Sequence, residues 1–281
     1  MTKCNFIKQK ESKFLFISGE DSKDFLQSLI TNDINKCSKS NSIYSCLLSP
    51  QGKFIADFFI TTCSNKYLIE IHQKLFEYFL SRIKIYKLRS NIEIKENLDF
   101  NSVIFLENNI LKEYNNDIIY FKDPRNNKIG NKAYIKKDMF NDFVNELKLH
   151  EINFNIYREL LMKNLIPYSV EDLIVNKSLL LENNFQNLNA IDWDKGCYVG
   201  QEITARMKYR SLLKKNLRTL KILSGNISIN SKIFDDNNEI GEIVSFTKNF
   251  AFGMLNIQKA TKIIKTDKIL SSENAKLKII G

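Results

Sequence analysis

The order of hydrophobic and polar positions predicts a mixture of strands and helices over the first 210 residues. Short runs rich in β-branched and aromatic residues predict strands over 12–17, 43–48, 53–62, 67–71 and 91–95. Apolar residues at 3.6-residue spacing predict helices over 73–86, 138–149, 155–165 and 200–210. A further helix follows Asp21, which we expect to cap it, and this helix buries Phe25, Leu26, Leu29 and Ile30.

Turn signals connect these elements. The strands 43–48 and 53–62 flank Ser49-Pro50-Gln51-Gly52, which predicts an antiparallel hairpin. Pro167 ends the helix over 155–165. Residues 98–122 alternate short apolar runs with Asn-rich turns, 169–181 are ambiguous, and 182–194 are Asn-rich and expected to be irregular.

The pattern changes after about residue 212. Short strands over 217–223, 231–234, 240–246, 250–255 and 276–280 are separated by polar turns, which predicts a small β-barrel. We therefore expect an α+β fold with mixed antiparallel sheet and helix modules. Residues 1–212 would form two interleaved α+β modules, and 213–281 the C-terminal barrel.

Composition excludes several classes of protein. The 281 residues include 43% hydrophobic and 11% aromatic residues, which supply ample apolar surface to offset the entropy of ordering. No apolar run approaches the roughly 18–20 residues of a membrane-spanning helix, and mean hydropathy is −0.28. Five Cys are too few and too irregularly spaced for a disulfide framework.

The N-terminal residues contain no long apolar segment and no Arg-rich amphipathic leader, so we expect a cytoplasmic protein. Only two His occur, far apart, and no Cys or His spacing fits a zinc site. Glycine-rich nucleotide motifs are also absent from the sequence. We expect no stably bound metal, because the Cys and His spacings do not supply the several ligands that a metal site needs.

The net charge of +10 has two interpretations. It favours a nucleic acid or an anionic small molecule as partner, through a general positive field. The chain is also rich in Lys, Asn and Ile and poor in Arg, Ala, Gly and Pro, which is typical of a codon bias that places Lys at ordinary solvated positions. The basic residues are dispersed along the sequence, so we expect no direct nucleic-acid binding.

The most informative segment is 194–206, which reads D-K-G-C-Y-V-G-Q-E-I-T-A-R. Two of only nine glycines, Gly196 and Gly200, fall here, and both permit close backbone approach. Cys197 lies just before a predicted helix, where backbone N–H groups and Lys195 would favour a thiolate. One interpretation is a reactive or ligand-contacting thiol; the other is a small residue buried in a tight turn.

The polar pair Gln201 and Glu202 lies at the start of the same helix. A Glu in the first turn is an ordinary choice that complements the helix dipole. A fixed carboxylate can instead accept two N–H bonds from the aminopyrimidinone edge of a pterin.

The run K-G-C-Y-V-G-Q-E at 195–202 resembles the K-G-C-Y-x-G-Q-E signature of the YgfZ-type folate-binding proteins, which are related to the aminomethyltransferase (T-protein) of the glycine cleavage system. The flanking segments 188–193 and 205–210 fit the same pattern. Further likeness lies in 25–34, with its T-N-D end, in the 47–57 hairpin, in 86–90, and in the C-terminal segments 241–245 and 251–255.

The resemblance implies a T-protein-like fold of three modules around a cavity that accepts tetrahydrofolate. It implies a role in maturation or repair of 4Fe–4S proteins, with links to tRNA modification, and iron–sulfur assembly machinery or client 4Fe–4S enzymes as partners. Matched to the family, Cys197 and Asp57 are the candidate catalytic residues. The candidate folate-binding residues are Asn32, Asp57, Glu182, Lys195, Gly196, Tyr198, Gly200, Gln201, Glu202 and Arg206.

The chain departs from the family in one place. Relatives carry an Arg-x-x-x-Gly-x-Pro pattern, and here Leu161 and Leu165 occupy the Arg and Gly positions before Pro167. Arg158, one helical turn earlier, is a candidate substitute for binding the glutamate tail of a folate.

Three hypotheses follow. The first is a tetrahydrofolate-binding accessory protein for iron–sulfur proteins. The second is a folate-dependent aminomethyl- or methyltransferase in which Asp57 handles a proton. The third, a nucleic-acid-binding protein, rests on charge alone.

Overall fold

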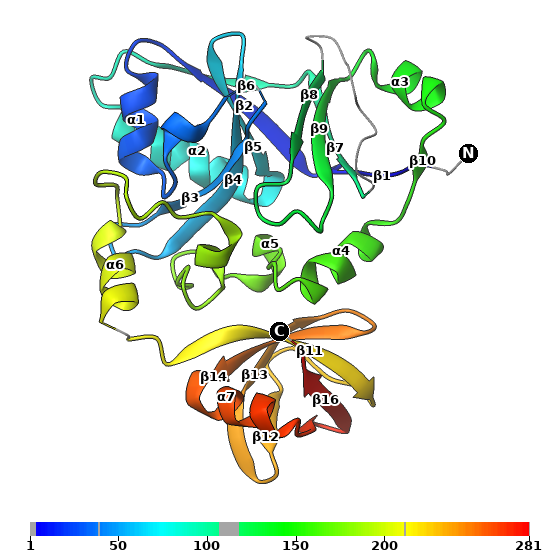
Figure 1. Ribbon diagram of the computed structural model, residues 1–281. Coiled ribbons are helices and arrows are strands. Elements are labelled where there is room, and N and C mark those ends of the chain that lie inside the picture. Colours follow the sequence, from blue (N-terminus) through cyan, green and yellow to red (C-terminus); the bar gives the residue numbers. More distant parts are fainter. Residues whose placement is uncertain (1–3, 39, 107–117, 211, 281) are drawn as a thin grey trace. The chain divides into compact units, whose positions relative to one another are not determined.

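Two five-stranded sheets and their helices carry the N-terminal part of the chain. A computed structural model describes residues 4–38, 40–106, 118–210 and 212–280 (Figure 1). The chain divides into unit 1, which is Met1–Phe154 with Asn187–Gln201, and unit 2, which is Asn155–Gln186 with Glu202–Gly281.

The first sheet of unit 1 has the order β3-β4-β5-β2-β6, and every neighbouring pair is antiparallel. Its strands are β2 (Ser12–Ser18), β3 (Ile43–Leu48), β4 (Phe54–Cys63), β5 (Lys66–His72) and β6 (Glu93–Asn97). The predicted 43–48/53–62 hairpin is confirmed, and its turn is closed by a hydrogen bond from Gly52 N to Ser49 O of 2.8 Å.

Helix α2 (Gln73–Lys87) packs against this sheet. Helix α1 (Ser22–Leu29) buries Phe25, Leu26 and Leu29. The ring centroids of Phe79 on α2 and Phe58 on β4 lie 4.9 Å apart. A one-turn 3-10 helix, η1 (Ile34–Lys36), follows α1.

The second sheet of unit 1 has the order β10-β1-β7-β9-β8. Its strands are β1 (Asn5–Lys8), β7 (Phe100–Phe105), β8 (Ile118–Lys122), β9 (Asn131–Lys136) and β10 (His150–Glu151). The β1–β10 pair is parallel and the others are antiparallel. Helix α3 (Phe140–Glu146) places Phe140 and Phe143 in the core of this sheet.

Unit 2 contains a closed six-stranded barrel of order β11-β14-β13-β12-β15-β16. Its elements are β11 (Lys215–Ser224), β12 (Lys232–Asp235), β13 (Asn238–Phe246), β14 (Phe250–Asn256), α7 (Ile257–Thr266), β15 (Leu270–Ser272) and β16 (Ala275–Ile279). The predicted C-terminal barrel is therefore confirmed. Its interior is aliphatic, with Leu220, Ile233 and Leu277 among the fully buried side chains.

Three helices complete unit 2: α4 (Phe154–Lys163), α5 (Ser169–Asp172) and α6 (Gln201–Tyr209). The segment 155–186 joins the barrel because Thr219 Oγ1 donates to Met162 O (2.6 Å) and Leu217 N donates to Glu182 O (2.7 Å). The compact unit around the barrel thus includes residues that the expected division at 212/213 assigned to the N-terminal region.

Some local predictions were wrong. Asp21 precedes α1 but makes no side-chain cap, since its carboxylate accepts a hydrogen bond from Asn91 N instead (2.6 Å). The helix expected over 138–149 is limited to α3, because the chain turns after Leu147 and enters β10. The ambiguous stretch 169–181 contains only the short α5. Residues 107–117 of the 98–122 stretch lie outside the described residues.

In the four described ranges, no helix combines the length and the apolar character needed to cross a membrane.

Candidate functional site

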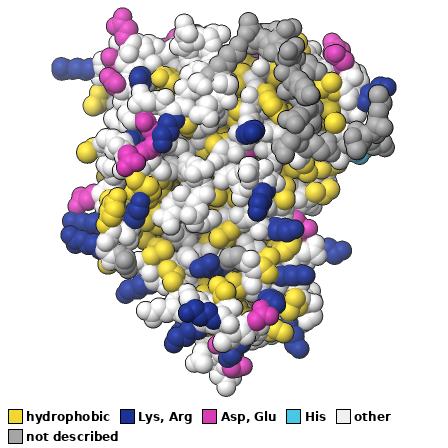
Figure 2. Space-filling view, in the orientation of Figure 1, with side chains coloured by type: hydrophobic (Ala, Val, Ile, Leu, Met, Phe, Trp, Pro, Cys, Tyr) yellow, Lys and Arg dark blue, Asp and Glu magenta, His cyan; other side chains and the backbone are white. Residues whose placement is uncertain are grey.

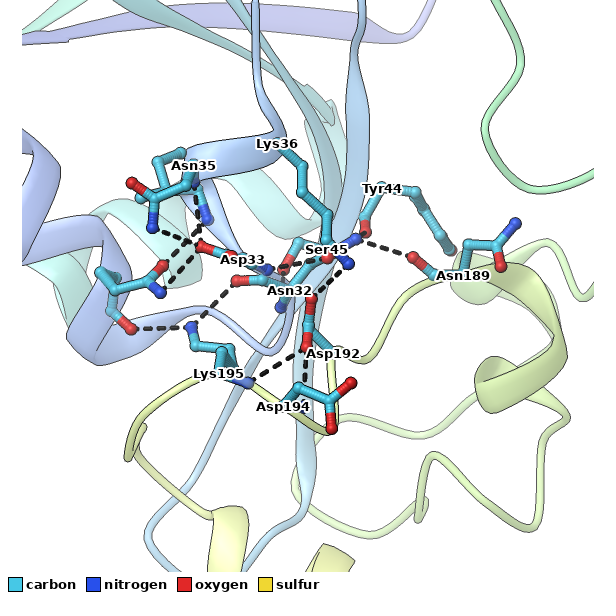
Figure 3. A network of polar contacts seen from close by, with 12 residues as sticks. Asn32, Asp33, Asn35, Lys36, Tyr44, Ser45, Asn189, Asp192, Asp194 and Lys195 are labelled. Carbon is cyan, nitrogen blue, oxygen red and sulfur yellow. Dashed lines mark hydrogen bonds and ion pairs between the residues drawn. The ribbon is translucent and has the colours of Figure 1, made fainter.

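Residues 189–200 lead into the signature and contain most of it, and we call them the signature segment. This segment lies against the end of α1 and against β3 (Figure 3). Thr31, directly after α1, is fully buried and donates its hydroxyl to Ala190 O at 2.6 Å. The same hydroxyl accepts from Cys46 N on β3 at 2.9 Å. Thr31 therefore joins three segments that are remote in the sequence.

Asn32 extends this connection. Its side-chain amide donates to Tyr44 O (2.8 Å) and to Asn189 O (2.7 Å), while Oδ1 accepts from Asp33 N (2.8 Å). Both amide N–H groups are therefore used by the protein. Asn32 was predicted as a folate contact; in the structure its side chain fixes the signature segment to β3.

Lys195 is the most unusual residue of the segment, because its ammonium is buried with a residue exposure of 9%. Its Nζ donates to three carbonyl oxygens around the end of α1: Gln27 O (2.7 Å), Ile30 O (2.6 Å) and Asn32 O (2.9 Å). The last carbonyls of a helix lack intrahelical partners and carry the negative end of its dipole, so a cation is favoured there.

Burial lowers the pKa of Lys195 to about 8, while Asp33 and Asp192 act in the opposite direction. The ammonium is therefore mostly charged at neutral pH. Since its three N–H groups point to carbonyls, Lys195 positions the segment; it does not supply the cation expected beside the Cys197 thiol.

Asp192 fixes the loop from the other side. Its Oδ1 accepts from Asp194 N (2.8 Å) and Lys195 N (3.1 Å), and its Oδ2 pairs with Lys36 Nζ (2.5 Å). Burial alone would raise the pKa of this carboxyl, but the hydrogen bonds from Lys36 and from the two backbone N–H groups lower it overall.

The lowered pKa of Asp192 predicts an acid-dependent contribution to stability. A carboxyl whose pKa is lower in the folded state stabilises above its unfolded pKa, and that contribution is lost as pH falls through its folded pKa. We expect Asp192→Asn to lower the free energy of unfolding by about 1–2 kcal/mol at pH 7. In urea titrations the difference from the unsubstituted chain should shrink below about pH 4; a difference independent of pH would contradict this role.

The two glycines of the signature differ sharply. Gly200 has φ +82°, and a Cβ there would lie 2.5 Å from Ser49 O and 2.8 Å from Leu48 Cβ. A Cβ on Gly196 would meet no atom within 4 Å. Gly200 is thus required for packing on the β3–β4 hairpin, whereas the backbone at Gly196 faces open space.

Cys197 is exposed. The residues on either side are fixed: Lys195 as described, and Val199 through a hydrogen bond from its N to Ser28 O (3.2 Å). The interpretation of Cys197 as a small residue buried in a tight turn is therefore wrong. The segment presents an accessible thiol on a well-anchored loop.

Two aromatic side chains near the predicted site, those of Tyr198 and Phe54, are buried. Tyr198 is 6% exposed, with the Lys195 ammonium 5.1 Å from its ring centroid, and Phe54 is fully buried. Both pack within unit 1.

The charged pair at the start of α6 is exposed. Glu202 and Arg206 form an ion pair of 2.8 Å one helical turn apart, and Gln201 is half-buried. Glu182 lies 4.0 Å from the Lys215 ammonium. Glu182, Glu202 and Arg206 belong to unit 2, whereas the other predicted site residues belong to unit 1.

Asp57 on β4 is half-buried and accepts a hydrogen bond of 2.6 Å from the Tyr44 hydroxyl. Burial raises the pKa of Tyr44 well above its ordinary value, with Asp57 adding to this effect, so Tyr44 keeps its proton and acts as donor. The guanidinium of Arg125 lies 5.4 Å from the Tyr44 ring centroid. Because Tyr44 O also accepts from Asn32, Asp57 is linked to the Asn32 network.

Arg158, the suggested substitute for the family's arginine, binds protein carboxylates. It is 4% exposed, with Nε 3.0 Å from Glu171 and Nη2 2.6 Å from Asp172. Burial raises the pKa of Asp172, and the positive charge of Arg158 lowers it in part. These contacts are those of a structural ion pair that holds α4 to α5.

Sequence reasoning missed three residues of this network: Thr31, Tyr44 and Asp192. Thr31 and Asp192 lie inside segments that resemble the family, so their position was a usable signal. Tyr44 carries no motif, and only its place opposite β4 in the sheet reveals it.

The hollow found in unit 1 lies apart from the predicted site residues. No group of three or more His, Cys, Asp or Glu residues in the described part of the chain could hold a metal ion. A hollow in unit 1 is lined by Thr62, Cys63, Lys66, Tyr67 and Ile119, and contains none of the predicted site residues.

The fold is similar to that of a solved aminomethyltransferase of the glycine cleavage system. The structure is similar to the crystal structure of glycine cleavage system aminomethyltransferase T from Bartonella henselae, with a TM-score of 0.77, 12% identity, and coverage of 99% of this chain and 85% of that one. This likeness confirms the predicted fold class.

Curated relatives carry a more specific name, "Iron-sulfur cluster assembly factor IBA57 homolog, mitochondrial". The chain is 28% identical to that of Neurospora crassa, over 76% of this chain and 53% of the relative. It is 26% identical to that of Mycosarcoma maydis (72% and 53%) and 24% identical to that of Dictyostelium discoideum (74% and 60%). The chain thus spans about half to three-fifths of the length of these relatives. No family model matches it.

The expected cytoplasmic location was wrong, since these relatives are named as mitochondrial. The expectation rested on the N-terminal residues and on the Cys count. Neither feature separates the cytoplasm from other compartments in which thiols stay reduced.

Proposed function

We propose that this chain is a tetrahydrofolate-binding accessory protein for the assembly or repair of 4Fe–4S proteins. The observation that carries the proposal is the likeness, over about three quarters of the chain, to relatives named as iron–sulfur cluster assembly factors. The K-G-C-Y-V-G-Q-E run supports placement among the YgfZ-type proteins.

The donor set fits a reduced folate by its chemistry. A folate has an N–H-rich pterin edge and a carboxylate tail. Taken unit by unit, a carboxylate such as Asp57 in unit 1 or Glu202 in unit 2 is of the type that binds the first, and a guanidinium such as Arg206 is of the type that binds the second. The folate would supply a one-carbon carrier, and in the accessory role the chain binds it without transferring that unit.

Cys197 is the residue through which the chain would contact a cluster-bearing partner. Its exposed thiol fits transient exchange with the thiols or iron of a cluster-bearing partner. Stable cluster binding by this chain alone would need further thiolates. The other four Cys belong to other segments and are expected to be dispensable as a set.

Folate binding is tested by calorimetry with tetrahydrofolate. We expect saturable binding, weakened about tenfold by Glu202→Gln or Asp57→Asn, which corresponds to losing one charge-assisted hydrogen bond. Glu93→Gln, at an exposed position of β6, is the matched control and should bind as the unsubstituted chain does. Absence of saturable binding would remove folate from the proposal.

The assembly role is tested by expressing the chain in cells that lack the homologous factor. Rescue of 4Fe–4S enzyme activity is expected. Enzyme activity that stays at the level of the deficient cells, despite normal amounts of the chain, would contradict the proposal.

A folate-dependent aminomethyl- or methyltransferase is the second candidate. Two observations favour it: the fold shared with an aminomethyltransferase, and the Asp57 carboxylate held by the Tyr44 hydroxyl. An assay of one-carbon transfer to tetrahydrofolate separates the two candidates. Turnover that Asp57→Asn abolishes would favour the enzyme.

A further inference from the structure

The positive charge of the chain is concentrated in its C-terminal part, although the basic residues were expected to be dispersed along the sequence. Residues 202–281 hold 15 Lys and Arg against 7 Asp and Glu, which gives +8 of the total +10. In Figure 2, Lys and Arg side chains outnumber Asp and Glu over the region that Figure 1 assigns to α7 and the barrel.

The fold brings two basic segments of unit 2 together. The first is the link from α6 to β11, of which the structure describes Arg210 and 212–214, and the second is α7. Lys214 O accepts a hydrogen bond of 3.0 Å from Ile257 N, the first residue of α7. We call the surface formed by this link and α7 the basic face, and its exposed cations are Arg210, Lys214, Lys262 and Lys265.

The acidic residues of the barrel are paired elsewhere. Lys268 binds Asp235 and Asp236, Lys232 binds Glu239 and Glu242, and Lys278 binds Asp267. Helix α7 itself contains no Asp or Glu. Among the residues that the structure describes, no carboxylate forms an ion pair with Arg210, Lys214, Lys262 or Lys265. The charge of the basic face is therefore not neutralised within the described part of unit 2.

Apolar side chains are exposed on the same segments. Leu212 is 54% exposed and Ile264 46%. Aliphatic side chains gain little from a phosphate backbone, whereas protein interfaces combine apolar anchors with charges that steer association. A protein surface therefore fits this face better than a nucleic acid does.

We propose that the basic face is a docking surface for an acidic protein that also presents apolar residues. The inference rests on the proposed function in one respect, since the partner would be a component of the assembly machinery or a client protein. It adds the chemistry of that partner and the segments of this chain that bind it.

The test uses the full chain with a photo-crosslinking residue in place of Ile264, in cells that lack the homologous factor. Two background variants are compared: Lys262→Glu with Lys265→Glu, and the matched control Lys23→Glu with Lys95→Glu, at exposed positions of unit 1. Both should fold normally, with thermal midpoints near that of the parent chain, because all four side chains are exposed.

We expect the crosslink to join a protein segment of net negative charge. Reversal of Lys262 and Lys265 should reduce crosslinking about tenfold, and the control should not. The inference is overturned if the reversed variant crosslinks equally, if the crosslinked molecule is a nucleic acid, or if the crosslinked segment carries no net negative charge. Rescue of 4Fe–4S enzyme activity by the parent chain is scored separately, so failure of the proposed function is distinguishable from failure of the inference.

Discussion

Replacing Lys195 by Met is expected to lower the free energy of unfolding by about 3–5 kcal/mol, because it removes a buried cation and leaves its partners without a donor. The three carbonyls of Gln27, Ile30 and Asn32 receive hydrogen bonds of 2.6–2.9 Å from one ammonium. Met fills a similar volume but donates nothing. Urea unfolding at pH 7 measures the change, which is a large part of the roughly 5–15 kcal/mol of a typical domain.

The control for this prediction is Lys23→Met, at an exposed position of α1. It should change the free energy of unfolding by less than about 0.5 kcal/mol. If Lys195→Met were as stable as Lys23→Met, the ammonium would not hold the signature segment in place, and the account of Lys195 as a positioning residue would fail.

Replacing Gly200 by Ala is expected to cost about 2–4 kcal/mol, since it combines a left-handed backbone with a steric clash. The backbone has φ +82°, and the added Cβ would lie 2.5 Å from Ser49 O, an atom of a tight turn that has little room to move. The hairpin and the signature segment would have to separate. The thermal midpoint and urea unfolding both report this loss.

The same sequence supplies the matched control. In Gly196→Ala, the added Cβ meets no atom within 4 Å, and the expected change is below about 0.5 kcal/mol. Equal losses for the two substitutions would show that the signature needs both glycines for the same reason, which contradicts the packing described for Gly200.

The sequence was sufficient for the fold class because its periodicity is strong where the fold is regular. The β3–β4 hairpin and the C-terminal barrel follow from alternating residues and turn signals, and the structure has both. Boundaries that depend on tertiary contacts were less accessible. The segment 155–186 belongs with the barrel through contacts such as Thr219 to Met162, which no local pattern reveals.

The signature directed attention to a segment whose contacts the structure describes, whereas the functional roles of its residues stay predictions. The signature identified a segment that the structure anchors, with its Cys exposed. Lys195 was expected to favour a thiolate, yet its ammonium binds carbonyls about 165 residues earlier in the chain. A contact between a side chain and a distant backbone carbonyl cannot be predicted from residue types, because every residue has a carbonyl.

We propose that an anchored segment presents the Cys197 thiol for exchange with iron–sulfur proteins. This proposal is tested most directly by Cys197→Ser in cells that lack the homologous factor, with 4Fe–4S enzyme activity as the readout and the thermal midpoint of the purified variant measured in parallel. The account predicts that enzyme activity stays at the level of the deficient cells, while the thermal midpoint matches that of the unsubstituted chain. Full rescue by Cys197→Ser, or a variant that fails to fold, would contradict it.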